Sequence, residues 1–180
     1  MKTKLFGDKK IIIRKIDKLD LKKAKKFQDF INSLTKQRAH LLINEKMTIK
    51  DEIKFLEGVI KTTKSKTKVF LVAEHDDKVI GTASVELEKW RRNHIGKLGI
   101  AIRDGYRGMG LGKYLMSETI RLAKRELKPK PKMIQLEVYV NNKIAIKFYK
   151  KMGFKTVGKI PKQIQYKGKL IDEFIMILYL

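Results

Sequence analysis

A glycine-rich segment near the middle of the chain has the residue types that bind a phosphate-containing ligand. Residues 98–113, LGIAIRDGYRGMGLGK, take an apolar run into Gly108, Gly110 and Gly112, where a helix is expected to begin. Successive backbone N–H groups at a helix N-terminus form a concave anion site, and the helix dipole adds to the attraction. Glycine suits such a site because a β-carbon would keep a diphosphate away from the backbone. The segment therefore predicts a pyrophosphate-binding loop.

Three other interpretations of a glycine loop compete with this one. A P-loop requires Ser or Thr after its Gly-Lys pair, whereas Gly112-Lys113 is followed by Tyr114. The dinucleotide fingerprint G-x-G-x-x-G is a poor fit, because Lys113 stands where the third glycine should be. The third is a plain tight turn between strand and helix, which the loop alone does not exclude.

A second motif downstream sharpens the interpretation. Residues 136–154 read LEVYVNNKIAIKFYKKMGF and contain, in order, Asn142, Ala145, Tyr149 and Gly153-Phe154. With Arg107-x-x-Gly110-x-Gly112 after a strand, this resembles the GNAT superfamily of N-acetyltransferases. The family's two signatures are Arg/Gln-x-x-Gly-x-Gly/Ala, and Asn-x-x-Ala followed by Tyr and Gly-Phe. Both occur here in the family's order and separation, and the resemblance extends from Lys9 to the end of the chain.

The resemblance implies acetyl-CoA as co-substrate and no metal. The glycine loop would hold the pyrophosphate, and residues 100–102 would pair with the pantetheine arm as if it were another strand. In this family a bulge separates that strand from its neighbour and opens a slot for the arm. Asn142 would hydrogen-bond the pantetheine from the other side. The implied cofactor-binding residues are Ile100, Ala101, Ile102, Arg107, Gly108, Met109, Gly110, Leu111, Gly112, Lys113 and Asn142.

Transfer of an acetyl group to an amine sets the catalytic roles to be filled. The amine must lose a proton, the charge on the carbonyl oxygen must be stabilised, and the departing sulfur must be protonated or otherwise stabilised. By resemblance, Tyr149 is the general acid near the sulfur, and a backbone N–H near Ile102 is the oxyanion donor. The alternative for Tyr149 is a core tyrosine on the apolar face of its helix.

The general base is less constrained by the sequence. Glu137 lies in an alternating strand and points with Gln135 and Tyr139, away from Leu136 and Val138. Its position resembles that of the glutamate that acts through water in some family members. The alternative carboxylates are Glu86, Glu88, Asp172 and Glu173. A further alternative is an amine that arrives already deprotonated, in which case there is no dedicated base.

The elements that must position these residues follow from hydrophobic periodicity. A second helix begins at Thr48, where Thr48 and Asp51 resemble a capping box, and Ile49, Ile53, Leu56 and Ile60 form its expected buried stripe. The other expected helices cover residues 20–34, 110–127 and 143–152. The expected strands cover residues 9–17, 69–74, 79–88, 95–102, 134–140, 156–166 and 170–179.

This order, β-α-α-β-β-β-α-β-α-β-β, predicts an α/β (α+β) fold of the GNAT type. We expect a central mixed, mostly antiparallel sheet of about seven strands, flanked by about four helices. Residues 1–180 are expected to form a single N-acetyltransferase domain. The last strand, residues 171–180, is apolar on both faces, so it is either central in the sheet or part of a dimer contact.

Composition excludes several classes of site. Cysteine is absent, which excludes disulfides, thiolate metal sites and a cysteine nucleophile. The three histidines lack the spacing of metal ligands. No apolar run reaches the ~18 residues of a membrane span, so a cytoplasmic protein without a membrane partner is expected. The net charge of +24 would attract nucleic acid and anionic cofactors, but lysines spread along the whole chain indicate solvated surfaces.

The acceptor is expected to be a primary amine. A protein N-terminus or lysine suits a basic enzyme if the target is acidic. A small amine or polyamine would be repelled by the net charge of +24 unless carboxylates line the pocket. The alternative to an enzyme is a basic nucleic-acid-binding protein on the same scaffold, but the retained motif residues argue against a decayed site. Because members of the family are often dimers, the resemblance also implies a homodimer.

Overall fold

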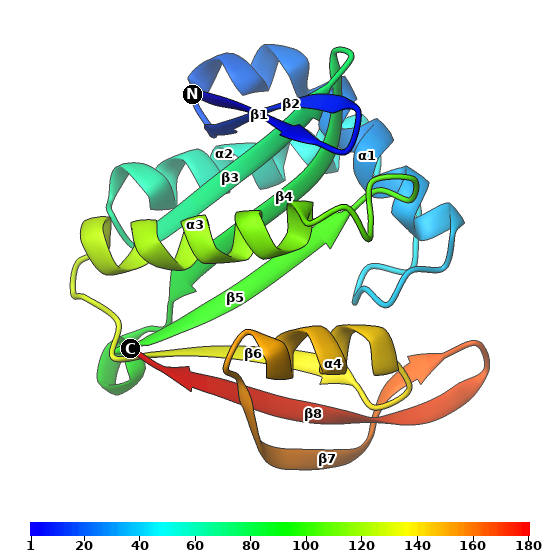
Figure 1. The fold of residues 1–180 in the computed structure, drawn as a ribbon, viewed down its shortest axis with the longest axis vertical. Coiled ribbons are helices and arrows are strands. Elements are labelled where there is room, and N and C mark those ends of the chain that lie inside the picture. Colours follow the sequence, from blue (N-terminus) through cyan, green and yellow to red (C-terminus); the bar gives the residue numbers. More distant parts are fainter.

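The computed structural model describes all 180 residues and contains one eight-stranded sheet, in the order β1-β2-β3-β4-β5-β6-β8-β7 (Figure 1). Only β5 and β6 are parallel, and all other neighbouring strands are antiparallel. The strands are β1 (Lys2–Phe6), β2 (Lys9–Lys15), β3 (Lys68–His75), β4 (Lys78–Leu87), β5 (Ile95–Ile102), β6 (Met133–Tyr139), β7 (Lys155–Tyr166) and β8 (Lys169–Tyr179). The helices are α1 (Ala24–Lys36), α2 (Ile49–Lys64), α3 (Leu111–Glu126) and α4 (Lys143–Lys151). The predicted fold class is confirmed, with one strand more than expected.

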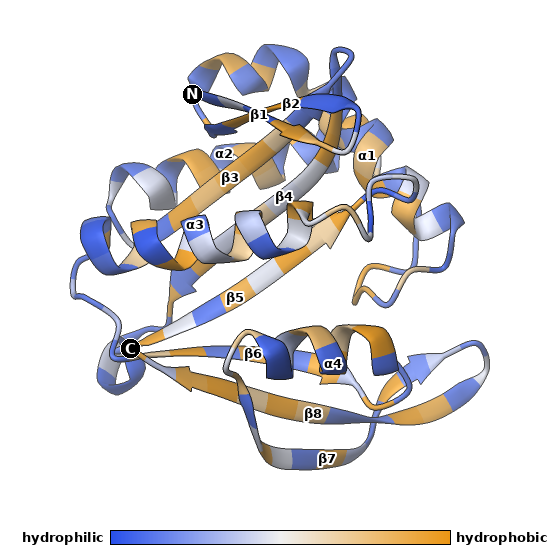
Figure 2. Ribbon diagram, in the orientation of Figure 1, coloured by the Kyte–Doolittle hydropathy of each residue, from blue (hydrophilic) through white to orange (hydrophobic).

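Helices cover both faces of the sheet, with α1 and α2 on one face and α3 and α4 on the other (Figure 1). Strand β3 shows why: Leu71 and Ala73 belong to the core under α3, whereas Phe70 and Val72 belong to the core under α1 and α2. Hydrophobic and hydrophilic residues alternate along the helices (Figure 2), and the buried apolar ones pack on the sheet. None of them combines the length and apolar composition that crossing a bilayer requires.

The N-terminal region differs from the prediction in two respects. Strand β1 was not predicted, because its side chains are mostly exposed and it is held chiefly by pairing with β2. The segment expected to start a helix at Asp20 instead begins as a 3-10 helix, Lys18–Lys23, which Asp17 caps, and α1 follows at Ala24.

Helix α2 begins as predicted but presents a different face to the core. The capping box is confirmed, because the Thr48 hydroxyl accepts from the Asp51 N–H at 3.2 Å while the Asp51 carboxylate accepts from the Thr48 N–H. The predicted buried stripe is wrong at Ile49 and Ile53, which are exposed. The buried residues are Glu52, Leu56 and Val59. The helix is rotated relative to the prediction because Leu56 and Val59 pack into the core against β3.

The sheet opens between β5 and β6. These strands pair only from Ile95↔Met133 to Lys97↔Gln135, after which β5 stays with β4 and β6 stays with β8. The two strands diverge from there on (Figure 1), and residues of both line an open space between them, which we call the slot. The last strand, β8, lies inside the sheet between β6 and β7. This agrees with one of the two predicted alternatives, that its two apolar faces mark a central strand.

Candidate active site

The edge of β5 that faces the slot carries unpaired backbone groups. The N–H of Arg103 donates to Ile80 on β4, and the carbonyl of Ile95 accepts from Glu88 N after β4. Because these groups alternate along a strand, the N–H and C=O groups of Ile100 and the N–H of Ile102 point the other way, into the slot, whereas the Ile102 C=O accepts from Arg107 Nε. The three free groups lie on the edge where residues 100–102 were expected to pair with an extended ligand.

The predicted bulge is not on β5. The β4–β5 ladder runs without interruption from Gly81↔Ile102 to Leu87↔Gly96. The nearest irregularity lies on β4, where the pairs Ala73↔Gly81 and Glu74↔Val79 leave Ile80 without a partner on β3. The slot opens because β5 and β6 each remain paired with their other neighbour.

The glycine loop lies at the start of α3, where the sequence predicts an anion site. Gly108 and Gly110 have φ of 80° and 90°, and a β-carbon on either would project into open space. The first helical hydrogen bond runs from Tyr114 N–H to Gly110 C=O, so the N–H groups of residues 111–113 lack a partner within the helix. This backbone fits a diphosphate.

Side chains of the loop hold this backbone in place. Arg107 Nε donates to the Ile102 carbonyl at 2.9 Å, which ties the loop to the end of β5. Leu111 is fully buried and Met109 packs on the same core, whereas Lys113 is exposed. A β-carbon on Gly112 would lie 3.2 Å from Ile102 Cδ1, so Ile102 would have to shift by a few tenths of an ångström to admit a larger residue. The loop residues Arg107 to Lys113 and the strand residues Ile100, Ala101 and Ile102 therefore lie next to one another.

Asn142 and Tyr149 approach the slot from the β6 side. Asn142 Oδ1 accepts from Ala145 N–H at 3.2 Å and caps α4, which leaves its amide NH₂ group free for a ligand. Tyr149 packs between Phe148 and Phe154, and its hydroxyl has no hydrogen-bond partner. Burial raises the pKa of Tyr149 to about 12, so the phenol stays protonated at neutral pH. Both residues line the same cavity as Ile100.

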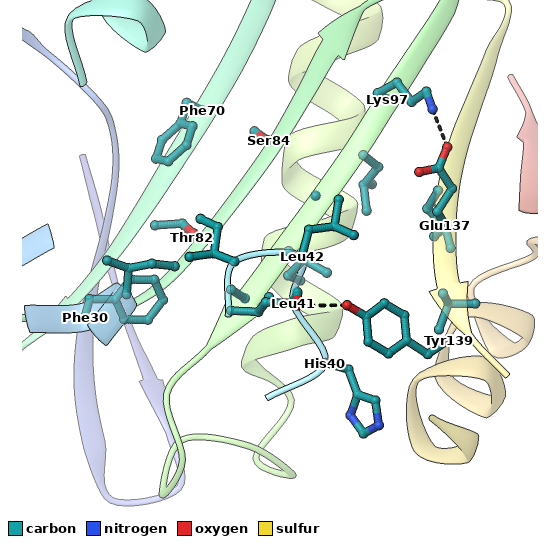
Figure 3. Close-up of a pocket in the computed structure, with 18 of the residues that line it drawn as sticks. Phe30, His40, Leu41, Leu42, Phe70, Thr82, Ser84, Lys97, Glu137 and Tyr139 are labelled. Atoms are coloured by element: carbon teal, nitrogen blue, oxygen red, sulfur yellow. Dashed lines mark hydrogen bonds and ion pairs between the residues drawn. The ribbon is translucent and has the colours of Figure 1, made fainter. Parts of the chain in front are cut away.

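That cavity, of about 550 Å³, extends from the slot across the sheet face under α1 and α2 (Figure 3). Its floor is open because small side chains stand in its centre: Thr82 and Ser84 on β4, and Gly99 and Ala101 on β5. Its roof comes from the two helices and from the α1–α2 loop, through Phe27, Phe30, Ile31, His40, Leu41, Leu42, Ile43, Met47, Glu52 and Phe55. We call this space the acceptor cavity.

The α1–α2 loop is fixed to the rest of the molecule at three points. Tyr139 Oη donates to Leu41 C=O at 2.8 Å (Figure 3). Tyr166 Oη donates to Arg38 C=O at 2.7 Å. Asn32 bonds both the N–H and the C=O of Met47. Hydrogen bonds from Asn32, Tyr139 and Tyr166 therefore hold the α1–α2 loop in place over the acceptor cavity.

The structure separates the candidate carboxylates. Glu137 lines the acceptor cavity and forms an ion pair with Lys97 across the slot (Figure 3). Glu173 is buried in the same lining, and burial raises its pKa, with a further contribution from Glu137. The remaining three carboxylates lie outside the lining and are paired with basic side chains: Glu86 with Lys68, Glu88 with Arg92, and Asp172 with Lys159.

Glu52 is a site residue that the sequence analysis missed. It is only 4% exposed, it lines the acceptor cavity, and its carboxylate has no hydrogen bond or ion pair. Burial raises its pKa to about 7. Glu52 shares the inward face with Leu56 and Val59 at i, i+4, i+7 spacing, but the more apolar stripe through Ile49 and Ile53 hid this face in the sequence.

Comparison with known proteins identifies the family of this chain. The model of the acetyltransferase (GNAT) family matches residues 36–154. The L-amino acid N-acetyltransferase AaaT of Escherichia coli (strain K12) is 33% identical over 107 residues, 59% of this chain and 65% of that protein. An N-alpha-acetyltransferase of Sulfurisphaera tokodaii is 31% identical over 117 residues, 59% of this chain and 66% of that protein. The chain thus spans just under two thirds of each relative.

The fold is also that of solved acetyltransferases. The crystal structure of an acetyltransferase of the GNAT family from Streptococcus pneumoniae has a TM-score of 0.81 and is 26% identical, covering 94% of this chain and 99% of that one. The chain therefore belongs to the acetyltransferase (GNAT) family, the family of acetyl-CoA-dependent N-acetyltransferases.

Proposed function

We propose that this protein is an N-acetyltransferase that moves the acetyl group of acetyl-CoA to a primary amine by direct attack on the thioester. The observation that carries the proposal is the continuity of one cavity. The slot edge of β5, Asn142 and Tyr149 share a single space with Glu137 and Glu173 on the acceptor side. The pantetheine arm of acetyl-CoA would run along β5 from the glycine loop. Its thioester would then lie in the part of this cavity that an amine can enter from the side of α1 and α2.

Acetyl-CoA would supply an acetyl thioester. The amine nitrogen would form the new bond to the acetyl carbon as the carbon–sulfur bond breaks, and the amine would lose one proton. Glu137 would take that proton, directly or through water, and the Ile102 N–H would stabilise the charge on the carbonyl oxygen. Tyr149, with its pKa raised to about 12, would donate a proton to the departing sulfur and recover it from solvent.

The acceptor belongs to the primary amines. The names of the two relatives point to L-amino acids and to alpha-amino groups. A protein N-terminus, a lysine side chain and small amines or polyamines are all consistent with the chemistry of the slot. Carboxylates in the lining support a cationic acceptor, because they offset the positive field of the chain locally.

The test is isothermal titration with acetyl-CoA at two salt concentrations, followed by assays of CoA release with a panel of amines. Binding with unit stoichiometry that survives the higher salt concentration, together with amine-dependent CoA release, is the expected result. Binding that vanishes with salt, or no release with any amine, would refute the proposal and favour a basic nucleic-acid-binding protein.

A further inference from the structure

The acceptor cavity has the opposite charge to the chain around it. The net charge is +24, yet the lining carries three carboxylates, Glu52, Glu137 and Glu173, against one lysine, Lys97. Lys97 is already paired with Glu137, and burial lowers the pKa of His40, which keeps that ring neutral at pH 7. The lining therefore attracts a cation and offers no unpaired cation for the carboxylate of an amino acid.

The carboxylates lie at opposite sides of the acceptor cavity. Glu52 enters from α2, which packs on β3, whereas Glu137 and Glu173 enter from β6 and β8. Strands β4 and β5 lie between these two sides. With neighbouring strands ~4.8 Å apart, β3 and β6 are roughly 14 Å apart or more, because the slot widens the sheet. A ligand that reaches both sides must therefore be elongated.

The space between the two sides is apolar and partly aromatic. Phe30 and Phe70 face it at the Glu52 side, across from Glu137 and Tyr139 (Figure 3). The rings of Phe55 and Phe70 meet edge to face at 6.3 Å. Apolar walls favour a methylene chain, and aromatic faces attract an ammonium group. Arg103, whose guanidinium stacks on Phe30, lies outside the lining.

Glu52 is available for a ligand because nothing in the chain pairs with it. Its side chain is largely buried and the carboxylate has no hydrogen bond or ion pair within the chain, so a cationic ligand in the cavity would supply its partner. The charged lysines nearest in sequence, Lys50 and Lys54, are exposed on the outer side of α2. The fixed position of Met47, which Gln28 and Asn32 hold, keeps the start of α2 against the cavity.

We propose that the acceptor is an elongated aliphatic diamine or polyamine, with its reacting amine at the slot beside Glu137 and its second ammonium group bound by Glu52. This inference rests on the proposed N-acetyltransferase function and names the substrate class of that site. Glu52 acts in it as a specificity-determining residue and takes no part in the proton transfers.

The matched substrates for the test are 1,6-diaminohexane and hexylamine, with L-leucine and a short peptide as further acceptors. We expect kcat/KM for the diamine to exceed that for the monoamine by roughly tenfold or more, since a charge-assisted hydrogen bond in a partly buried site has that effect. Glu52→Gln should reduce this ratio toward one by lowering kcat/KM for the diamine. The control Glu57→Gln changes an exposed carboxylate on the same helix and should keep the ratio.

Binding provides a second readout. The diamine should raise the melting temperature of the CoA-bound protein more than hexylamine does, and Glu52→Gln should abolish that difference. A diamine-to-monoamine ratio near one in the parent protein, an unchanged ratio in Glu52→Gln, or a clear preference for leucine or the peptide would overturn the inference. These outcomes leave acetyl transfer intact, whereas absence of acetyl-CoA binding would refute the proposed function itself.

Discussion

Lys97 on β5 and Glu137 on β6 form an ion pair at the point where their strands separate. Lys97 is the last residue of β5 that pairs with β6, and Glu137 lies two residues beyond its partner Gln135. The pair therefore bridges the inner end of the slot. It also leaves Glu137 partly exposed, with 34% of its side chain accessible, so water can reach the carboxylate. Glu137 is thus positioned for proton transfer through water.

Glu137→Gln tests the role of this carboxylate as a base. Gln cannot accept the amine proton, so kcat should fall roughly tenfold or more, while the Kd for acetyl-CoA stays within about twofold. Steady-state kinetics and isothermal titration measure the two quantities. Glu86→Gln, which breaks an ion pair with Lys68 outside the acceptor cavity, is the control and should leave kcat unchanged. An active Glu137→Gln enzyme would mean that amines arrive already deprotonated.

Tyr149→Phe removes a hydroxyl without changing the packing against Phe148 and Phe154. Loss of a general acid should lower kcat by roughly a hundredfold, with acetyl-CoA affinity nearly unchanged. Burial raises the pKa of Tyr149 to about 12, so the phenol stays protonated below that pH. Ionisation of Tyr149 should therefore cause no loss of activity between pH 8 and 10. Full activity in the Phe variant would show that Tyr149 is a core packing residue and no general acid.

Much of this site follows from sequence because its chemistry is local. The glycine loop, Arg107 and the strand that precedes them lie within one segment, and their backbone geometry depends on residue types a few positions apart. The alternation along β6 likewise predicted that Glu137 and Tyr139 share one face, and both line the acceptor cavity. Both predictions needed only the local repeat of a strand or the start of a helix.

The rest depends on contacts between distant segments. The rotation of α2, which turns Glu52 inward and Ile53 outward, is set by packing on β3 and cannot be read from hydropathy, which favours isoleucine inside. Which carboxylates line the cavity and which form ion pairs elsewhere depends on partners distant in sequence, such as Lys68 for Glu86 and Lys97 for Glu137. The anchors of the α1–α2 loop, Tyr139 and Tyr166, come from the other end of the chain.

Gly110→Ala tests the glycine loop. Gly110 has φ of +90°, where a β-carbon is strained by about 1–2 kcal/mol, and it begins the helix whose N–H groups would face the pyrophosphate. The Kd for acetyl-CoA should rise about tenfold or more. Gly7→Ala is a matched control, because Gly7 also has positive φ with open space around it but lies in the β1–β2 turn. Equal acetyl-CoA affinity in both variants would contradict the assignment of the loop.

Gly99→Leu tests the floor of the acceptor cavity. A β-carbon at Gly99 meets nothing closer than Ser84 Oγ at 3.7 Å, so the fold accepts a side chain there. A leucine would project into the acceptor cavity beside the slot and should raise KM for the amine by about tenfold, with acetyl-CoA binding preserved. Thermal melting checks that the variant is folded. An unchanged KM would place the amine elsewhere.

Glu52→Gln should stabilise the protein, and by more at high pH. Burial raises the pKa of Glu52 from 4.5 in the unfolded chain to about 7 in the fold, so the folded state favours the protonated form. Stability from this group is complete below the unfolded pKa and is lost as the pH rises through 7. The only cause of the shift is burial, and the charged groups of the same cavity are Lys97, Glu137 and Glu173.

The glutamine variant stays neutral and escapes this loss, so its advantage at pH 8 over pH 5 should be roughly 2 kcal/mol, or about 4–8 °C in Tm. Melting curves at both pH values measure it, with Glu57→Gln expected to show no such difference. A variant that is less stable than the parent at pH 8 would mean that Glu52 has a partner in the free protein. A stabilised variant that has also lost its preference for diamines would show that the buried carboxylate is retained for binding at the expense of stability.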